Sequence, residues 1–565
     1  MSLLDVKEKQ LANPITIKNH LKVGDLDAET DTSLLETCFV DKGYISQLMD
    51  VGDPLSIVLG RTGAGKSALI YKISQLAEKS KQIDPNDISI RFLEHSDIIQ
   101  FLDTLDVNLD LFYRLLWRHI LIVELLKLRY NIKNETDNRN FFDSISDYFR
   151  RDTVKKKAIE YFREWGDRFW LDTDEHLKVI TQKLENDTKA NLGAKYTGLS
   201  FSVSGAEKLT DEQKIEIKQR ASQVVSGLQI QKLNEMLDLI SEHSFHDPQQ
   251  KFYIVIDQLD ESWANTITRC KFIRALIEEI KTFRKVENIK IIAAMRKDLL
   301  DLVFDKTRGA GFQEEKYESY ILPIKWTRDE LTDLIEKRVK EVFKRQYTNE
   351  DVTFKDIFPS ATKGGGQLAI DFIMERTLFR PRDILQFVNE CFKVAYGRER
   401  ISWRTIYAAE AQYSEKRLKS LKEEWGEVYP SFDETVEILR GLQTSFKRSD
   451  LSESRLEHII TDLYDQKTDD PCVCAVKEYF DTTGEVKQAE ILNKILICLY
   501  RVGAIGIKIS ALSTFMWSFF DQSTVSRGEV RRASQIKVHK MLYRSLDIQV
   551  TGSERFEVID TEDLP

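Results

Sequence analysis

The sequence predicts an α/β protein with a parallel sheet at its core, followed by a mainly helical part. Three apolar runs lead to this prediction, at residues 55–59, 253–256 and 289–296, and helical patterns at 68–76 and 270–283 follow the first two. The later two runs are too uniformly apolar for half-exposed strands, so they suit central strands covered by helices on both faces. From Trp326 onward helical patterns dominate, at 330–343, 367–375 and 381–395, the last beginning with a proline.

Length and composition describe an ordinary soluble protein with several domains. The chain has 565 residues, of which 42% are apolar and 31% charged. This length exceeds one hydrophobic core and predicts about three domains. The net charge of −9 argues against non-specific coating of nucleic acid, although it does not exclude a local basic patch.

The chain is expected to lie in the cytoplasm, away from membranes. Its N-terminus lacks the basic-then-apolar layout of a signal peptide. The densest apolar stretch, 111–128, is interrupted by charged residues and a histidine, so it predicts a buried soluble helix rather than a membrane span. Six scattered cysteines fit reduced thiols, and their spacing predicts no metal site beyond one for Mg²⁺.

We divide the chain into four segments: a lead-in at residues 1–50, the α/β core at 51–325, a helical lid at 326–400 and a C-terminal domain at 401–565. The core carries a helical insertion at about 131–248. Inside this insertion, Thr210 and Gln213 match a capping box that opens a helix. Residues 196–203 alternate like a hairpin, and 88–92 alternate like a second strand of the core.

Residues 60–67 read GRTGAGKS, a complete phosphate-binding loop placed between an apolar strand and a helix. Glycines let backbone N–H groups wrap a phosphate chain, and the following helix N-terminus adds favourable partial charge. Lys66 is expected to pair with the β- and γ-phosphates, and the Ser67 hydroxyl to ligate Mg²⁺. The predicted nucleotide-binding residues are Gly60, Arg61, Thr62, Gly63, Ala64, Gly65, Lys66 and Ser67.

Acidic residues follow the strand at 253–256 and supply a second nucleotide motif. Asp257, at the strand end, is expected to reach Mg²⁺ directly or through water. Asp260 and Glu261 come just beyond it, where a carboxylate can orient the water that attacks the γ-phosphate. The alternative for these acids is a surface turn that merely ends a strand.

Three arginines are candidates for reading the phosphate chain. Arg296 ends the third strand, where it could distinguish ATP from ADP; the alternative is a solvated arginine paired with Asp298. Arg380 and Arg382 sit at a predicted helix start, where cations oppose the helix dipole. An anionic partner would explain them, and a solvated helix start is the alternative.

The combination of GRTGAGKS, VIDQLDESW, AAMRKDLL, IKWTRDEL and RPRDILQFVN resembles the signal-transduction class of AAA-like P-loop ATPases. This ASCE-type class contains STAND and origin-recognition relatives, and the likeness is strongest to bacterial ATPases linked to anti-phage defence. It covers roughly residues 35–400. The resemblance implies a P-loop NTPase core, a helical lid and a C-terminal winged-helix domain. It also implies that Asp257 is the metal carboxylate, Asp260 or Glu261 the catalytic carboxylate, Arg296 the first sensor and Arg382 the lid sensor.

One departure from the pattern of fast ATPases concerns the residue after Asp257. Those enzymes commonly carry glutamate there, whereas this chain carries Gln258 and places its acids three and four residues after Asp257. The choice between Asp260 and Glu261 therefore stays open, and slow turnover is expected. The absence of an N-K-x-D motif favours ATP over GTP.

The C-terminal segment carries a basic cluster on what the pattern predicts to be a winged helix. A helical pattern ends near Gly503 and leads into a strand, and residues 514–520 and 536–543 are candidate wing strands. The basic residues there are Arg527, Arg531, Arg532, Lys537, His539, Lys540 and Arg544. Contact with duplex DNA and a solvated or protein-contacting surface remain equal alternatives.

The sequence therefore predicts an ATP- and Mg²⁺-dependent molecular switch of a defence or signalling system. Its output would pass through DNA, a separate effector protein or self-association into a homo-oligomer in one nucleotide state. The principal alternative is a DNA-dependent ATPase in replication, repair or mobile-element maintenance. A small-molecule kinase fits less well, because the acidic and lid motifs suit hydrolysis better than transfer to an acceptor.

Overall fold

The computed structural model describes most of the chain as two compact units. The described residues are 15–84, 96–131, 173–196, 198–227, 230–245, 247–259, 266–307, 314–346, 352–361, 366–468, 470–481, 487–520 and 524–550. Unit 1 comprises Met1–Val40, Thr62–Ala64 and Lys325–Pro565, and unit 2 comprises Asp41–Arg61 and Gly65–Ile324. The division into four segments stays a prediction.

Unit 2 is built on a five-stranded sheet in which every neighbouring pair is parallel. The strands lie in the order β2 (Ser80–Ile83), β3 (Phe252–Ile256), β4 (Ile289–Arg296), β1 (Ile57–Gly60) and β5 (Ile321–Pro323). Strands β1 and β3 are buried along their whole length, as expected for central strands. The predicted α/β core with a parallel sheet is confirmed. The strand expected at 88–92 lies outside the described residues.

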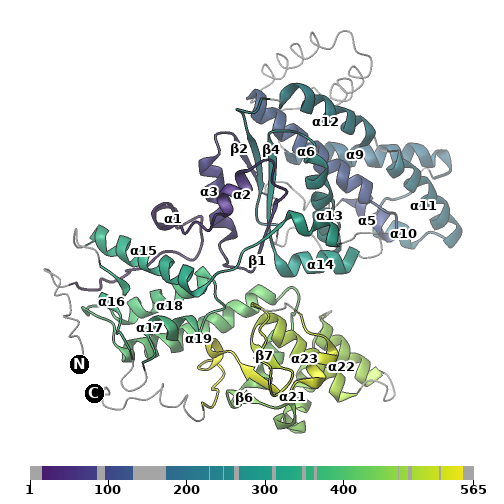
Figure 1. The fold of residues 1–565 in the computed structure, drawn as a ribbon. Helices are drawn as coiled ribbons and strands as arrows, with labels where there is room; N and C mark the ends of the chain where they lie inside the picture. Colours follow the sequence, from purple (N-terminus) through teal and green to yellow (C-terminus); the bar gives the residue numbers. More distant parts are fainter. Residues whose placement is uncertain are drawn as a thin grey trace, which may run out of the picture. The chain divides into compact units, whose positions relative to one another are not determined.

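Helices cover both faces of this sheet (Figure 1). The helices of unit 2 are α2 (Tyr44–Met49), α3 (Lys66–Leu76), α5 (Asp97–Thr104), α6 (Asp110–Tyr130), α9 (Thr173–Leu192), α10 (Val203–Glu207), α11 (Asp211–Ser226), α12 (Ile230–Ser244), α13 (Thr266–Phe283) and α14 (Lys297–Thr307), with short 3-10 turns η1 (Ala194–Tyr196) and η3 (Glu314–Tyr320). The predicted long helix is α6, and fourteen of its residues are buried. None of the described helices has the length and apolar content needed to cross a membrane.

The polar insertion is helical where it is described. Helix α11 begins at the predicted capping box, in which the Thr210 hydroxyl accepts a hydrogen bond from the Gln213 backbone and the Gln213 side chain accepts one from the Thr210 backbone. The expected hairpin at 196–203 is wrong. Ser202 instead caps α10 by accepting a hydrogen bond from the Gly205 N–H, which commits the following residues to a helical turn.

Unit 1 combines helices with a small antiparallel sheet. Its helices are α1 (Thr32–Cys38), α15 (Arg328–Gln346), α16 (Phe354–Ile357), α17 (Ala369–Met374), α18 (Pro381–Val394), α19 (Trp403–Trp425), α20 (Phe432–Val436), α21 (Glu453–Tyr464), α22 (Pro471–Asp481), α23 (Gln488–Val502) and α24 (Arg527–Arg532), with 3-10 turns η4 (Glu437–Leu439), η5 (Arg448–Asp450) and η6 (Lys540–Leu542). Its strands lie in the order β6 (Ser445–Phe446), β8 (Gln535–Val538) and β7 (Ile505–Lys508).

Two of the three C-terminal predictions agree with this sheet. Helix α23 ends at Gly503 in the left-handed conformation that glycine favours, and β7 follows. Strand β8 occupies the start of the run expected at 536–543, after which the chain turns into η6. The strand expected at 514–520 is wrong: only Met516 bridges to Ile507, and the aromatic rings of Trp517 and Phe519 pack against His539 instead.

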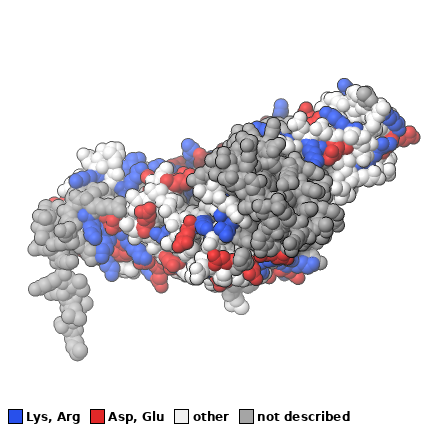
Figure 2. Space-filling view, turned by 90° about the horizontal axis from the view of Figure 1, so that it is seen from above, with Lys and Arg blue, Asp and Glu red and all other residues white. Residues whose placement is uncertain are grey.

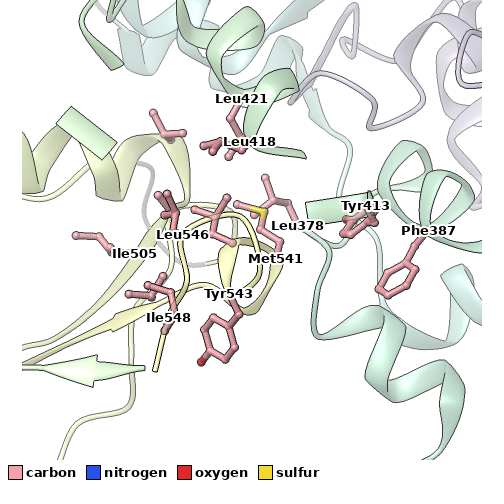
Figure 3. Packing of buried hydrophobic residues seen from close by; sticks show 14 of the residues in the cluster. Leu378, Phe387, Tyr413, Leu418, Leu421, Ile505, Met541, Tyr543, Leu546 and Ile548 are labelled. Atoms are coloured by element: carbon pink, nitrogen blue, oxygen red, sulfur yellow. The ribbon is translucent and has the colours of Figure 1, made fainter. Parts of the chain in front are cut away.

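The helices and the small sheet of unit 1 share one apolar core. Figure 3 shows Leu418 and Leu421 of α19 beside Met541 and Leu546 of the C-terminal segment, with Ile505 of β7 nearby. Polar contacts reinforce this packing, because the Ser414 hydroxyl of α19 donates to the Met541 carbonyl at 2.6 Å. Helix α19 is therefore attached directly to the C-terminal segment.

Candidate functional site

The glycine-rich loop connects the buried strand β1 to the start of α3, as the sequence predicted. Gly63 and Gly65 adopt φ angles of +73° and +94°. Side chains rarely tolerate this left-handed region, so these two glycines allow the loop to curl between strand and helix. Gly65 occupies the N-cap position of α3.

Lys66 is the first residue of α3, and its side chain turns back to the loop. Its ammonium group donates to the carbonyl oxygens of Gly60 and Arg61, both at 3.3 Å, and the residue is only 7% exposed. These contacts hold the ammonium group of Lys66 beside the loop, at the N-terminus of α3. A phosphate group is the kind of ligand that a buried ammonium and a helix N-terminus attract together.

The tip of the loop is held through its carbonyl oxygens. The Arg380 guanidinium donates to the Thr62 carbonyl at 2.6 Å, and the Trp326 indole donates to the Ala64 carbonyl at 2.8 Å. The carbonyl of Gly63 accepts from the backbone N–H of Arg382 at 3.3 Å. The approach at Gly63 is close, since an added Cβ would lie 2.5 Å from the Cβ of Arg382.

Arg380 belongs to a buried cluster of two arginines and two carboxylates. Its guanidinium pairs with Asp383 at 2.8 Å and with Glu424 at 2.9 Å, and Arg417 lies 3.3 Å from Asp383. Burial alone would raise the pKa of Asp383, but Arg380 and Arg417 hold it below its ordinary value. Because its guanidinium is engaged by two carboxylates and the Thr62 carbonyl, Arg380 is bound to protein groups rather than presented to a phosphate, contrary to our expectation.

Arg382, the expected lid sensor, is more accessible than Arg380. Its side chain is 30% exposed and lies 3.7 Å from the Asp27 carboxylate, and its Nε donates to the Leu26 carbonyl at 3.4 Å. These weak contacts hold the guanidinium less firmly than the Arg380 cluster does. The sensor role of Arg382 stays a prediction.

Three adjacent strands of unit 2 end at the same edge of the sheet and carry the other predicted residues. Asp257 follows β3, is 5% exposed and accepts a hydrogen bond from the Gln258 N–H at 2.9 Å. Arg296 ends β4, in register with Gly60 of β1. Parallel strands bring their carboxyl ends together, so Asp257, Arg296 and the start of the loop share one edge.

The ion pair between Arg296 and Asp298, one of our two interpretations, is present. The two side chains form two contacts, of 2.5 and 3.1 Å, and are each about 15% exposed. The sensor role of Arg296 stays a prediction. Asp260 and Glu261 lie outside the described residues, and the choice between them stays open.

The residues predicted to hold Mg²⁺ fit that ion. Ser67 offers a hydroxyl and Asp257 a carboxylate, and both are oxygen ligands. Magnesium usually keeps several waters and takes one or two carboxylates together with substrate phosphates. Two protein oxygens are therefore a sufficient contribution from the chain.

The basic C-terminal segment is extensively paired with acidic residues. Arg527 and Arg531 both contact Glu490, and Lys540 contacts Glu375 at 2.6 Å. From the sequence, His539 counts among the basic residues that could contact phosphates. This is wrong for His539, because the residue is only 4% exposed. Figure 2 shows basic and acidic side chains interspersed over the described part of one face of the molecule.

Trp326 is a site residue that motif analysis did not single out. It lies just before α15, and the only sequence signal is its position within IKWTRDEL. Its partner Ala64 is 262 residues away in the chain. No local pattern could have paired them.

Comparison with known proteins gives one matching domain family and a few distant relatives. The family described as FunZ-associated C-terminal helical domain matches residues 329–422, which include most of α15 and α19. The putative transposon gamma-delta 80.3 kDa protein of Escherichia coli (strain K12) is 22% identical over 96% of this chain and 69% of its own length. Allergen Alt a 2 of Alternaria alternata is 27% identical over 22% of this chain and 66% of its own length.

Among solved structures, a Walker-type ATPase of Pyrococcus abyssi aligns with 91% of this chain and 99% of its own. The identity is 13% and the TM-score is 0.31, below the level expected of two chains with one fold. The phosphate loop and the adjacent sheet edge are therefore the features that point to a function.

Proposed function

We propose that this protein is an ATP-binding and ATP-hydrolysing molecular switch that depends on Mg²⁺. The observation that carries the proposal is the loop from Gly60 to Ser67, with two left-handed glycines and a buried Lys66 at a helix N-terminus. The buried carboxylate of Asp257 at the same sheet edge supports it. Together these groups match the needs of a nucleotide phosphate chain and its metal ion.

Each residue has a role that follows from its chemistry. Loop N–H groups bind phosphate oxygens, and Lys66 pairs with the β- and γ-phosphates. Ser67 and Asp257 would hold Mg²⁺, which supplies charge neutralisation on the phosphates when bound. One of the acids Asp260 and Glu261 would orient the attacking water. Gln258 follows Asp257 directly, so we expect slow turnover, as suits a switch.

The switch would act through the state of its nucleotide. A ligand shifts a conformational equilibrium only by its different affinity for the two states, and ATP and ADP differ by one charged phosphoryl group. The C-terminal part of unit 1, proposed to be a winged-helix domain, would pass this difference to an effector protein or to another copy of the chain. A role in defence or signalling remains a hypothesis from the resemblance of the sequence.

A DNA-dependent ATPase of mobile-element maintenance is the alternative function. The name of the Escherichia coli relative, a putative transposon protein, favours it. The pairing of Arg527 and Arg531 with Glu490 argues against it. Arginines that are already paired with a carboxylate neutralise less phosphate charge, so fewer counterions are released from the DNA on binding.

The decisive experiment compares the full-length chain with its Lys66→Ala variant. We expect Lys66→Ala to weaken Mg-ATP binding by about 100-fold or more, since the ammonium makes charge-assisted contacts with two phosphates. Lys72→Ala, on the same helix, serves as the control and should bind normally. Unchanged affinity and turnover in Lys66→Ala would refute the proposal. Turnover that rises on addition of duplex DNA would select the alternative function.

A further inference from the structure

Three carbonyl groups at the tip of the phosphate loop accept hydrogen bonds from donors outside the loop. The donors are the Arg380 guanidinium for Thr62, the Arg382 backbone for Gly63 and the Trp326 indole for Ala64. These are consecutive peptide groups, so all three peptide planes at the tip are fixed by external partners.

Peptide geometry determines what this does to the N–H groups. In a planar trans peptide, the C=O of one residue and the N–H of the next point in opposite directions. The described residues contain no cis peptide bond. Because each carbonyl of Thr62, Gly63 and Ala64 points at its donor, the N–H groups of Gly63, Ala64 and Gly65 point away from those donors. Successive N–H groups presented together form an anion-binding nest.

We propose that Trp326 and Arg380 are positioning residues that orient these N–H groups toward the phosphate chain before nucleotide binds. The inference rests on the proposed function and adds two residues to that site. Neither side chain needs to touch the nucleotide: each acts through a carbonyl on the opposite side of the peptide from the N–H that binds phosphate.

The loop needs such external partners because glycine is conformationally free. Gly63 and Gly65 populate many backbone states when nothing restrains them, and fixing them costs conformational entropy. Partners that fix the peptide planes in advance improve affinity by reducing this cost at binding. The Arg380 donor is itself rigid, because Asp383 and Glu424 hold its guanidinium on two further sides.

The test removes the indole N–H donor of Trp326 and keeps an aromatic side chain in its place. Trp326→Phe eliminates the indole N–H and preserves an aromatic side chain at this half-buried position. Trp403→Phe is the matched control, because the Trp403 indole donates to the Ala361 carbonyl at 3.1 Å at another half-buried position of unit 1. Both variants lose one hydrogen bond from tryptophan to a backbone carbonyl. Only the first loses one that orients the phosphate loop.

We expect Trp326→Phe in the full-length chain to weaken Mg-ATP and Mg-ADP binding by about threefold to tenfold, the range set by one net hydrogen bond. The KM for ATP should rise by the same factor while kcat at saturating ATP is retained, a split that general destabilisation would not produce. Trp403→Phe should bind both nucleotides as the parent does. Calorimetric titration and steady-state turnover provide these values.

Arg380→Lys supplies a second measurement, because lysine keeps the charge and loses the forked donor. It should weaken binding at least as much as Trp326→Phe at temperatures where the variant is fully folded. If the parent chain binds nucleotide and Trp326→Phe and Arg380→Lys bind it equally well, the positioning role is overturned and the proposed function stands. If the parent chain binds no nucleotide, both proposals fall.

Discussion

His539 should make unit 1 sensitive to acid, and the size of the effect follows from its surroundings. Its imidazole is buried against the rings of Trp517 and Phe519, whose centroids lie 5.1 and 5.4 Å away. Its Nδ1 accepts a hydrogen bond from the Met541 N–H at 3.2 Å, which requires an unprotonated nitrogen. Burial, together with the cations Arg376 and Arg417, lowers the pKa of His539 to about 3.

The pKa difference fixes the direction of the pH dependence. An unfolded histidine has a pKa of about 6.5, so between about pH 6.5 and pH 3 the unfolded chain binds a proton that the folded chain does not. The stability of unit 1 therefore falls as the pH drops through this window. The loss from His539 alone is about 1.4 kcal/mol at pH 5.5 and about 2.8 kcal/mol at pH 4.5, from roughly 1.4 kcal/mol for each pH unit below 6.5.

The perturbation that isolates this effect is His539→Asn. The asparagine carbonyl can accept the Met541 hydrogen bond in place of Nδ1 and does not titrate. At pH 7.5 the variant should melt below the parent, because it loses the contacts with Trp517 and Phe519. This gap should narrow by roughly 4 °C at pH 5.5 and roughly 8 °C at pH 4.5, at about 3 °C per kcal/mol for a unit of this size.

Thermal unfolding followed by tryptophan fluorescence from pH 7.5 to 4.5 measures the gap. Carboxylates titrate in the same range, but they are common to both proteins and cancel in the difference. A gap that stays constant across the range would refute the assignment of a low pKa to His539. A gap that widens toward acid would mean that the pKa of His539 is raised in the folded chain rather than lowered.

Two further predictions concern a buried ion pair and a loop glycine. Glu279→Leu should destabilise unit 2 by about 3–5 kcal/mol, because it leaves buried Arg118 without the carboxylate that it contacts at 2.6 Å. Chemical denaturation should show a smaller loss of stability when Arg118→Met is added to Glu279→Leu. An equal or larger loss in the double variant would contradict this explanation. Gly63→Ala should lower nucleotide affinity, since its φ is +73° and its Cβ would meet Arg382 at 2.5 Å. Gly441→Ala, with a φ of +68° and open space around it, should cost about 1 kcal/mol of stability and leave nucleotide affinity unchanged.

Local patterns were sufficient to predict the elements that build the site. The loop, its strand and its helix are predicted by one contiguous run of residues, the phosphate-loop motif and the apolar residues on either side of it. The buried helix α6 is predicted by its apolar content. The capping box at Thr210 is equally local, since both of its hydrogen bonds span three residues. Elements specified within a few residues can be inferred from sequence alone.

Long-range partners account for what the sequence did not predict. Thr62 and Arg380 are separated by 318 residues, so motif analysis treats Arg380 as a free cation although it is fully engaged. The basic C-terminal segment shows the same limit of sequence analysis: its positive residues can be read from the sequence, but their pairing with Glu490 and Glu375 from other elements cannot. Which opposite charges meet is decided by tertiary packing.

A continuous set of contacts within unit 1 runs from the loop tip to the C-terminal segment. The Thr62 carbonyl binds Arg380, and Arg380 binds Glu424 near the end of α19. Further along the same helix, the Ser414 hydroxyl donates to the Met541 carbonyl, and its oxygen accepts the Ser545 N–H at 3.0 Å. Both ends of the path are thus attached to one helix of 23 residues.

This attachment bears on how a nucleotide switch could deliver its signal. A flexible linker between lid and C-terminal domain would let the loop tip move without consequence for the C-terminal segment. Helix α19 instead buries residues along most of its length, and packed interiors transmit displacements rather than absorb them. If binding of the phosphate chain shifts the carbonyls of Thr62–Ala64, we expect α19 and the C-terminal segment to move together as one body. The C-terminal surface would then report the nucleotide state without a separate hinge.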